Sequence, residues 1–359
     1  MPHLFEPFSL RGLTLSSRIV VSPMCQYSSV DGMANEWHFV HLGSRAVGGA
    51  ALVFTEASAV TPEGRISAQD LGIWSDDHVD GLARVTHFIH GQGAAAGIQL
   101  AHSGRKGSMP RPWDGVRLIP PSAGGWEPCG PTPDPFADGF PTPHALDRSE
   151  LRAIVEAFAH AACRAKAAGF DVVEVHAAHG YLLHEFLSPL SNTRTDEYGG
   201  SFDNRTRLCR EVVAAVRKEW PDHLPVFVRF SSTDWTEGGW DIEQSVELAR
   251  RLAGDVDLVD CSSGGNVATA TIPLGPGYQV PFSERIRRDA GVPTGAVGLI
   301  TTSAQADEIV RSGRADCVFL ARELLRDPYW PLRAARELGH GVRWPVQYLR
   351  AAPQGSVAR

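Results

Sequence analysis

Residues 171–184 read Asp-Val-Val-Glu-Val-His-Ala-Ala-His-Gly-Tyr-Leu-Leu-His, an apolar run that ends in imidazoles and a phenol. The run is short and rich in valine, as expected of a buried strand in a parallel sheet. A helical pattern at 149–168 precedes it, with Asp147 and Gly169 at positions suited to the two helix ends. The stretch therefore predicts a helix, then a buried strand, then a cluster of polar side chains.

The same alternation repeats along the whole chain. The sequence predicts eight short strands, at 18–22, 50–55, 96–101, 171–176, 226–230, 256–261, 293–297 and 315–320. Helical periodicity follows each one, at about 36–47, 77–92, 149–168, 203–219, 241–253, 281–290, 302–312 and 322–338. Eight such units are the signature of a single (β/α)8 TIM barrel, an α/β fold with its active site at the carboxyl ends of the strands. A doubly wound sheet is the alternative, but the G-x-G-x-x-G that usually follows its first strand is absent.

The composition is that of a folded protein and does not indicate binding to a polyanion such as nucleic acid or an anionic membrane. The chain has 359 residues, of which 43% are hydrophobic and 21% charged, which is ordinary for a globular protein. Its net charge of −7 argues against nucleic acid and anionic membrane surfaces as partners. No apolar run approaches the roughly 20 residues of a spanning helix, and the first residues lack the features of a signal peptide. We therefore expect neither a membrane nor nucleic acid as a partner.

The six cysteines, at positions 25, 129, 163, 209, 261 and 317, are scattered without close pairs. That spacing suggests neither a disulfide framework nor a C-x-x-C metal site. Reduced thiols fit the cytoplasm, which is the location we expect.

One connection, residues 103–147, is far longer than the others and holds ten of the 25 prolines. Loops of that length in compact domains are usually lids or binding loops, so we expect a cap over the barrel mouth. A surface insertion with no part in catalysis is the alternative. Arg105 and Lys106, near its start, either favour the 2′-phosphate of NADPH or are simply solvated. No linker divides the chain, so we expect one domain over residues 1–359.

His176, His179 and Tyr181 follow the fourth predicted strand, where a barrel has its active site. His-x-x-His can chelate a metal, but no other cluster at a strand end clearly completes three ligands, so no metal is expected. The other interpretation is a pair of N–H donors that bind a substrate carbonyl oxygen, with Tyr181 as the proton donor. A phenol has a pKa near ~10, stays protonated at neutral pH and suits a general acid. A metal-dependent hydrolase remains the rival interpretation.

Other strand ends also carry residues suited to a site. Cys25 follows the first strand, and taken alone its thiol is expected to be buried and inert. Gln99 ends the third strand, and the fifth carries Arg229, which is costly in a barrel interior unless it faces an anion or an electron-rich ring. Gly298 and Arg322 follow strands seven and eight, where barrels usually bind phosphate, although a surface salt bridge is the alternative for Arg322. FMN fits this pattern better than a nicotinamide without a Rossmann domain.

Several motifs resemble the old yellow enzyme family of FMN-dependent oxidoreductases over essentially the whole chain. Near the N-terminus, residues 4–8, 13, 18–20 and 22–24 are similar to that family's hairpin and first strand. The most specific stretch is 176–192, and the matching positions continue at 194, 196, 198–201 and 204–205. Cys25 with Tyr27, His rather than Asn at 179, and the ending 345–350 resemble the so-called thermophilic-like subgroup of ene-reductases.

The resemblance implies a barrel that holds FMN noncovalently at the carboxyl ends of its strands. The positions that match the family's flavin contacts are Pro23, Met24, Cys25, Ala57, Gln99, Arg229, Ser262, Gln279, Gly298, Ala321 and Arg322. Of these, Gly298, Ala321 and Arg322 are expected to hold the phosphate, and Arg229 to stabilise the anionic reduced flavin. Ala321 stands where the family often has glycine, a mild departure because the contact there is a backbone N–H.

The same resemblance implies an NAD(P)H-dependent ene-reductase of the NADPH dehydrogenase type. Its substrates are electron-poor alkenes such as enones, maleimides and nitroalkenes, with quinones and nitro compounds as further options. Hydride passes from flavin N5 to the β-carbon, and Tyr181 protonates the α-carbon. His176 and His179 bind the substrate oxygen, Tyr27 shapes the pocket, and Cys25 adjusts the flavin potential and the substrate affinity.

A homodimer or a dimer of dimers is also implied by the resemblance. Residues 340–359 are expected to form a tail from which Arg350 reaches the active site of a neighbouring subunit. Ala351 stands where an aromatic residue often follows. A relative with an iron–sulfur cluster would need a cysteine cluster after the barrel, whereas Cys317 is the last cysteine, so we do not expect one. A noncatalytic binding barrel is the least expected alternative, because a proton donor and a pair of hydrogen-bond donors for a substrate oxygen would serve no purpose there.

Overall fold

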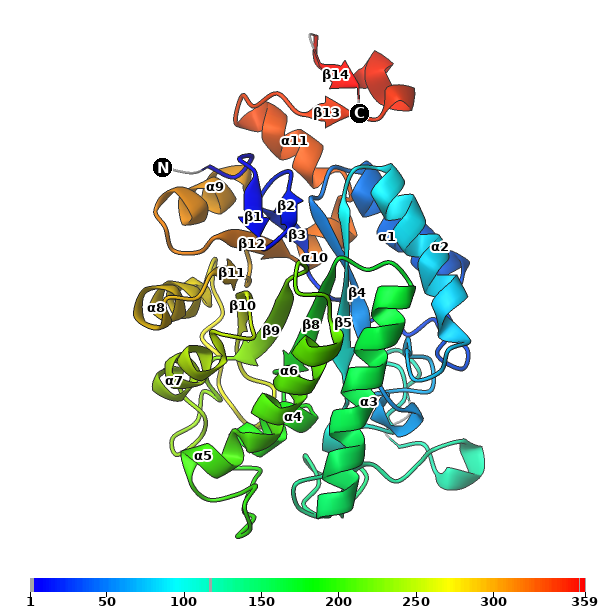
Figure 1. Ribbon diagram of the computed structural model, residues 1–359, viewed down its shortest axis with the longest axis vertical. Coiled ribbons are helices and arrows are strands. Elements are labelled where there is room, and N and C mark those ends of the chain that lie inside the picture. The colour runs from blue at the N-terminus through cyan, green and yellow to red at the C-terminus, as the bar shows by residue number, and fades with distance from the viewer. Residues whose placement is uncertain (1–2, 116–117, 355, 359) are drawn as a thin grey trace.

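A closed barrel of eight parallel strands forms the centre of the molecule in the computed structural model, which describes residues 3–115, 118–354 and 356–358 (Figure 1). The barrel strands are β3 (Ile19–Val21), β4 (Leu52–Ala59), β5 (Ala95–Ala101), β8 (Val172–Ala177), β9 (Val226–Ser231), β10 (Leu258–Ser262), β11 (Thr294–Ala296) and β12 (Cys317–Leu320). They pair in chain order, and β12 closes the barrel on β3. The predicted TIM barrel is therefore confirmed, and each of its strands overlaps a predicted one.

Helices surround the barrel on the outside. They are α1 (Glu36–Val47), α2 (His78–Gly91), α3 (Arg148–Ala167), α7 (Ile242–Leu252), α8 (Val280–Ala290) and α9 (Ser303–Arg311). Helix α3 shows why the local sequence folds this way. The Asp147 side chain accepts hydrogen bonds from the first turn, and the Glu150 carboxylate accepts one from the Asp147 backbone N–H. Gly169 takes a left-handed conformation (φ 81°) just after the helix.

Two predicted helices are each divided in the structure, which corrects the prediction. The segment 203–219 forms α5 (Phe202–Arg205) and α6 (Arg207–Glu219), joined by a single residue that remains near the helical region. The segment 322–338 forms α10 (Arg322–Arg326) and α11 (Trp330–Glu337). The second break has a clear cause. Pro328 disfavours helical geometry at the residue before it, and Asp327 is extended (φ −134°, ψ 92°).

The amino-terminal end of the barrel is closed by apolar side chains. Strands β1 (Phe8–Leu10) and β2 (Leu13–Leu15) pair antiparallel as a hairpin. Leu10 and Leu15 from this hairpin belong to one buried cluster with Phe54, Phe227 and Phe319 from the barrel interior. Phe54 lies 6.0 Å from Phe227 and 6.2 Å from Phe319 between ring centroids. The interior of the barrel at this end is therefore an apolar core.

Two segments extend from the barrel at opposite ends (Figure 1). The cap, residues 103–147, is mostly irregular and contains η2 (Gly104–Lys106), η3 (Pro121–Ala123) and a short pair of strands, β6 (Cys129–Gly130) and β7 (His144–Ala145). The tail contains β13 (Arg343–Trp344), η4 (Val346–Ala351) and β14 (Val357–Ala358), and lies on the side of β1 and β2. Positions 116–117 of the predicted cap, and 355 and 359 of the predicted tail, lie outside the described residues.

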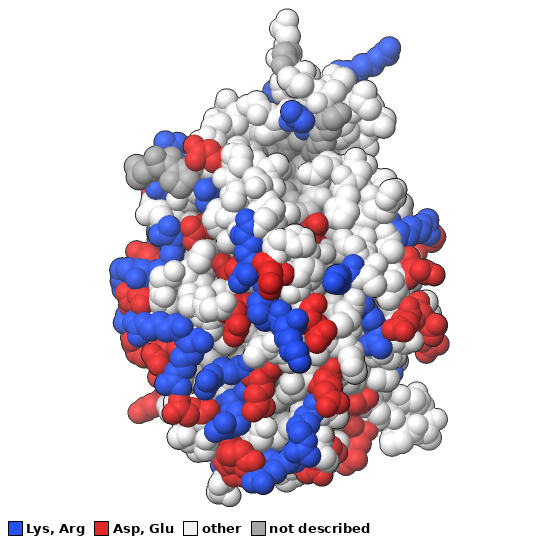
Figure 2. All heavy atoms as spheres, in the orientation of Figure 1, with Lys and Arg blue, Asp and Glu red and all other residues white. Residues whose placement is uncertain are grey.

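Charged side chains of both signs are interleaved on the face shown in Figure 2, and few of them lie where the tail joins the barrel. This distribution fits the net charge of −7, which comes from an excess of acidic residues and no basic tract. Within the described ranges, no helix is long and apolar enough to cross a membrane.

Candidate active site

His176, His179 and Tyr181 lie together at the carboxyl end of β8. His176 is the penultimate residue of that strand, and Tyr181 directly precedes the short helix α4 (Leu182–Leu187). The ring centroid of His176 lies 5.1 Å from that of His179 and 5.1 Å from that of Tyr181, both in edge-on contacts. The structure therefore brings the predicted oxygen-binding pair and the predicted proton donor into one cluster.

A strained turn carries this cluster and is held from several sides. His179 (φ 61°) and Gly180 (φ 70°) are both left-handed, and a side chain at 180 would collide with the Gly265 carbonyl, only 2.2 Å away. The His179 backbone N–H donates to Ser231 Oγ at 2.8 Å. The strained backbone of this turn is retained because neighbouring residues hold it by close packing and hydrogen bonds.

His184 and Asp234 fix the same turn from inside the protein. His184 Nδ1 accepts the Gly180 N–H at 2.9 Å, and its Nε2 lies 3.0 Å from Asp234 Oδ1. Both side chains are fully buried. Ser188 Oγ donates to the other Asp234 oxygen at 2.6 Å. Neither residue was predicted to have a role, because nothing in the sequence pattern relates two residues 50 positions apart.

Burial sets the protonation states in the cluster. The pKa values of His176 and His179 lie well below the ordinary value, first because both imidazoles are desolvated and then because the Arg229 guanidinium is near. Burial also raises the pKa of Tyr181 well above that of a free phenol. At neutral pH each imidazole is uncharged and has one N–H, and the phenol keeps its proton. His176 Nδ1 is buried without a hydrogen-bond partner among the described residues. A buried polar atom of this kind is available to bond a ligand.

Below the cluster lies a polar layer formed by Gln99, Glu174, Arg229 and Asp260, all buried. Arg229 Nε lies 3.1 Å from Asp260 Oδ2, and Gln99 Nε2 donates to Glu174 Oε1 at 2.7 Å. Burial raises the pKa of Glu174 to about 8 and that of Asp260 to about 6. Arg229 therefore faces an anion, one of the two partners that its predicted position requires. The two acids were missed, although a charged residue inside an apolar strand is itself a signal.

The loop after β3 contains Pro23, Met24, Cys25 and Tyr27, all half-buried. Burial, and then the nearby Asp70 and Glu56 carboxylates, hold the pKa of the Cys25 thiol well above its ordinary value, so the sulfur stays protonated. Burial likewise raises the pKa of Tyr27, whose ring meets Trp113 of the cap edge-on at 5.7 Å. The Cys25 thiol is therefore held in its protonated form, which is a poor nucleophile.

A cavity of about 160 Å³ lies between the ends of β10, β11 and β12. The predicted flavin positions that line it are Ser262, Gln279, Gly298, Ala321 and Arg322. Gly298 has φ 119°, and a Cβ there would lie 2.9 Å from Gln279 Nε2. The backbone at this position is thus open only because the residue is glycine. An exposed guanidinium, Arg322, lies at the cavity edge, so the site fits an anionic phosphate.

Polar contacts connect this cavity with the imidazole cluster. Ser262 Oγ lies 2.7 Å from His179 Nε2, and Gln279 Oε1 accepts from Ser263 Oγ at 2.6 Å. Ala57 of β4 pairs with Gln99 of β5 where the register between the two strands shifts. The predicted flavin positions therefore run from the barrel floor to the cavity. Arg229 Nε forms an ion pair with Asp260 but has no hydrogen-bond partner among the described residues.

Two predicted positions behave differently from the rest. Arg350 is exposed on the tail, at the end of the molecule away from the cluster, so the single chain does not bring it to the site. Arg105 is buried, and its guanidinium donates to Asn266 O at 3.0 Å, while its N–H donates to Glu185 Oε1 at 2.9 Å. The alternative of a solvated cation is therefore wrong for Arg105. This side chain attaches the cap to the barrel.

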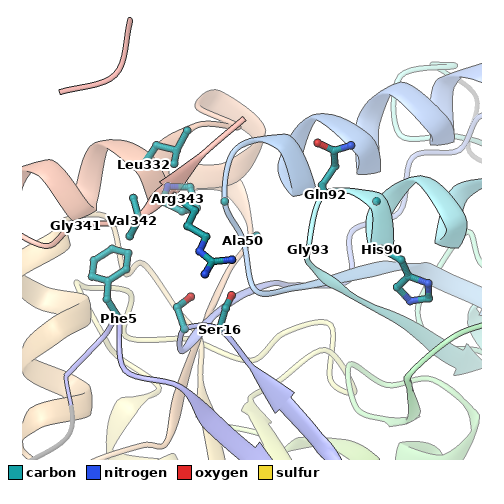
Figure 3. Close-up of a pocket in the computed structure, with 14 residues that line it drawn as sticks. Phe5, Ser16, Ala50, His90, Gln92, Gly93, Leu332, Gly341, Val342 and Arg343 are labelled. Carbon is teal, nitrogen blue, oxygen red and sulfur yellow. The ribbon is translucent and has the colours of Figure 1, made fainter. Parts of the chain in front are cut away.

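A roomier cavity, about 530 Å³, lies near the amino-terminal end of the barrel (Figure 3). Phe5, Ser16, Leu332, Val342 and Arg343 contribute to its walls. It also includes His90, but that imidazole lies 2.7 Å from Asp171. Only the carboxyl end combines, among the described residues, an imidazole pair and a phenol with a cavity edged by an exposed arginine.

Comparison with known proteins identifies the family of this chain. Residues 3–340 match the model of the NADH:flavin oxidoreductase / NADH oxidase family. The chain is 52% identical over 350 residues to a protein named NADPH dehydrogenase from Geobacillus thermodenitrificans (strain NG80-2), which covers 97% of this chain and 98% of the relative.

Solved structures give the same picture. Morphinone reductase in complex with tetrahydroNAD matches with a TM-score of 0.76 and 29% identity, over 96% of this chain and 93% of that one. A complex of 2-naphthoyl-CoA reductase with 2-naphthoyl-CoA matches with a TM-score of 0.84 and 26% identity, over 94% of this chain and 52% of that one. The present chain thus spans about half the length of that reductase.

Proposed function

The chain belongs to the NADH:flavin oxidoreductase / NADH oxidase family, the old yellow enzyme family that its motifs resemble, and from this premise we propose that it reduces the C=C bond of activated alkenes. The family and the NADPH dehydrogenase relatives confirm the predicted enzyme class, an NAD(P)H-dependent flavin oxidoreductase, with FMN as the cofactor and NAD(P)H as the reductant. The substrate class and the residue roles below are our proposal.

One observation carries the proposal: two neutral imidazoles and a protonated phenol converge at one strand end. His176 and His179 donate hydrogen bonds to the carbonyl or nitro oxygen of the substrate. As the β-carbon gains a hydride, negative charge moves to this oxygen, and the two N–H groups stabilise it. One such donor typically lowers a barrier by about 3 kcal/mol. Tyr181 then donates its proton to the α-carbon, which completes the addition of two hydrogens across the double bond.

FMN, when bound, would supply the hydride. The residues that would hold its ring and ribityl chain are Pro23, Met24, Ala57, Gln99, Arg229, Ser262 and Gln279, and those at its phosphate are Gly298, Ala321 and Arg322. Arg229 brings a positive charge to the barrel floor, where it favours an anionic ring. The protonated Cys25 thiol adjusts potential and affinity without acting as a nucleophile, and Tyr27 borders the substrate pocket.

We propose enones, maleimides and nitroalkenes as substrates, with quinones and nitro compounds as further options. All present an oxygen that two N–H donors can bind and an electron-poor atom that accepts hydride. The cap and barrel act as one domain, residues 1–359, with the cap over the site. Six cysteines without disulfides support a reducing location, which we take to be the cytoplasm.

A homodimer or a dimer of dimers completes the site in this proposal. Arg350 cannot serve its own barrel from the opposite end of the molecule, so it would reach the active site of a neighbouring copy. Val346 and Leu349 on the same tail are exposed apolar residues, 59% and 36% accessible, which fits a surface that another subunit covers. A protein that sediments strictly as a monomer and is fully active would exclude this arrangement.

The proposed function is tested with the FMN-loaded enzyme, NADPH and 2-cyclohexenone. Stopped-flow spectroscopy separates bleaching of the flavin by NADPH from its reoxidation by the alkene. The double variant His176→Ala/His179→Ala should bind FMN and be bleached, but reoxidise slowly with the alkene. Unchanged reoxidation by 2-cyclohexenone would show that these residues do not bind the substrate oxygen.

A further inference from the structure

Lys106 occupies an unusual place in a chain that uses arginine for nearly all its positive charges. Of the 34 Lys and Arg residues, only Lys106, Lys166 and Lys218 are lysines. Lys166 and Lys218 are exposed on α3 and α6, as is usual for this residue type. Lys106 is half-buried at the base of the cap, in η2. Lys106 is neither one of the predicted flavin contacts nor one of the residues proposed to bind the substrate oxygen.

Its ammonium group is held at two points beside the proposed proton donor. Lys106 Nζ donates to the His179 carbonyl at 2.8 Å and to the Gly265 carbonyl at 2.9 Å. The first carbonyl belongs to the strained turn that precedes Tyr181, and the second to the loop after β10. The same nitrogen lies over two aromatic rings, 5.1 Å from the centroid of Tyr181 and 4.5 Å from that of Phe136. The cap thereby places a fixed cation against the face of the phenol.

We propose that Lys106 is a positioning residue for Tyr181: its cation stabilises the phenolate left when Tyr181 gives up its proton, so that the tyrosine is a stronger acid. This inference rests on the proposed function, in which Tyr181 protonates the substrate. The physical need is evident, because burial alone disfavours the anionic phenolate and so opposes proton donation. A nearby positive charge favours the anion, and in a site shielded from water it does so more strongly than in solvent.

The assistance depends on the charge of Lys106 and is therefore sensitive to pH. Burial lowers the pKa of Lys106 to about 8, with the Glu185 carboxylate opposing the shift and Arg105 adding to it. The cation is thus present at neutral pH and is lost as pH rises through about 8. The ionisable groups that face Lys106 are Arg105 from η2, Glu185 from α4, and His176, His179 and Tyr181 from the cluster.

A double-mutant cycle tests the inference in the FMN-loaded enzyme. The rate of reoxidation by 2-cyclohexenone is measured for wild type, Lys106→Met, Tyr181→Phe and the double variant, from neutral pH to well above 8. Lys106→Met should lower the neutral-pH rate on the order of tenfold and abolish the decline that wild type shows near pH 8. In the Tyr181→Phe background it should have no further effect, because the group through which it acts is gone. Lys166→Met, on the exposed face of α3, is the matched control and should behave as wild type.

A second readout does not depend on turnover. With three lysines in the chain, ¹³C labelling of lysine Cε gives a simple NMR spectrum, and the Lys106 signal is assigned by its loss in Lys106→Met. Its titration should coincide with the decline in the wild-type rate. Burial raises the pKa of Glu185 to about 8, so this group gains its charge over the pH range in which Lys106 titrates. Glu185→Gln keeps the oxygen that accepts the Arg105 backbone N–H but removes that charge, so both the Lys106 titration and the rate decline should move to lower pH. This variant retains Lys106 and serves even if Lys106→Met does not fold.

The possible outcomes separate the two proposals. If Lys106→Met slows both backgrounds equally, or if the rate decline does not follow the Lys106 titration, the inference about Lys106 is wrong while the role of Tyr181 stands. If Tyr181→Phe itself reoxidises at the wild-type rate, Tyr181 is not the proton donor, and both proposals fail.

Discussion

The two ends of the barrel are built from the same strands and yet differ in almost every property. In β9, Phe227 belongs to the apolar cluster at the amino end, and Arg229, two residues later, lies in the polar floor of the site. In β8, Val172 belongs to the same apolar cluster, and Glu174 and His176 follow at the same two-residue spacing. Alternate residues of a strand face the same side and lie about 7 Å apart. The barrel interior therefore changes from apolar core residues to polar site residues within about 7 Å along a strand.

The difference shows how the molecule separates stability from catalysis. At the amino end, stacked phenylalanines and the β1–β2 hairpin exclude water and need no partners for polar groups. At the carboxyl end, the buried Glu174, Arg229 and Asp260 are costly to bury and persist as a mutually paired set. The loops at that end are also the ones that hold the left-handed turn of His179 and Gly180. Substitutions at the two ends should therefore affect different observables.

The largest effect is expected from Tyr181→Phe at the carboxyl end. Removal of a general acid should lower the rate of reoxidation by 2-cyclohexenone by about 10²- to 10⁴-fold, with thermal stability preserved because the ring remains. Stopped-flow absorbance of the flavin measures it. Tyr198→Phe is the matched control: it removes a hydroxyl that bonds Glu211 in the outer layer and should leave this rate unchanged. A similar loss of rate in both variants would mean that the effect of Tyr181→Phe does not arise from the loss of a proton donor.

At the amino end, Phe54→Ala should produce the opposite pattern. Loss of a buried phenylalanine next to Phe227 and Phe319 should cost about 3–5 kcal/mol of unfolding free energy. Denaturant titration followed by fluorescence measures it. The rate of alkene reduction per folded, FMN-loaded molecule should stay at the wild-type value. A strong loss of rate in the folded fraction would contradict the division between the two ends.

His179→Ala, with His176 kept, should raise the barrier to alkene reduction by about 3 kcal/mol, close to a hundredfold in rate. A distinct pH signature accompanies this loss. Since the pKa values of both imidazoles are well below 6.5, they stay neutral as pH falls through that value, and the wild-type rate should not change there on their account. A rate that follows an ordinary histidine titration would show that the imidazoles are exposed and charged.

The smallest effect concerns the His90–Asp171 pair, which links α2 to the residue before β8 at the amino end. Its hydrogen bond to Asp171 raises the pKa of His90, so the pair adds stability below the unfolded value near 6.5 and loses it as pH rises through the folded value. His90 is 40% exposed, so the gain is under about 1 kcal/mol. His90→Gln should flatten this part of the stability profile in urea titrations at several pH values. An unchanged profile would mean that solvent screens the pair completely.

Much of this organisation is readable from the sequence. The short apolar runs locate all eight strands, and the Asp147 cap and Gly169 delimit α3. The break before Pro328 was missed although its signal, a proline inside a helical pattern, is local. The His184–Asp234 pair was missed for a different reason. Asp234 follows a different strand, and only the pairing of β9 with β8 and the packing of their loops bring its carboxylate within 3.0 Å of the imidazole.

By itself, the sequence determined the order of strands and helices, the family, and which residue types stand at the strand ends, because these depend on local pattern and on position along the chain. Only the tertiary structure determined the protonation states of those residues and the charges that surround them. Neutral imidazoles, a protonated thiol, and a lysine cation over the Tyr181 ring all arise from burial and from charges contributed by distant segments. Desolvation and Coulomb interactions act through space, and neither can be read from spacing along one strand.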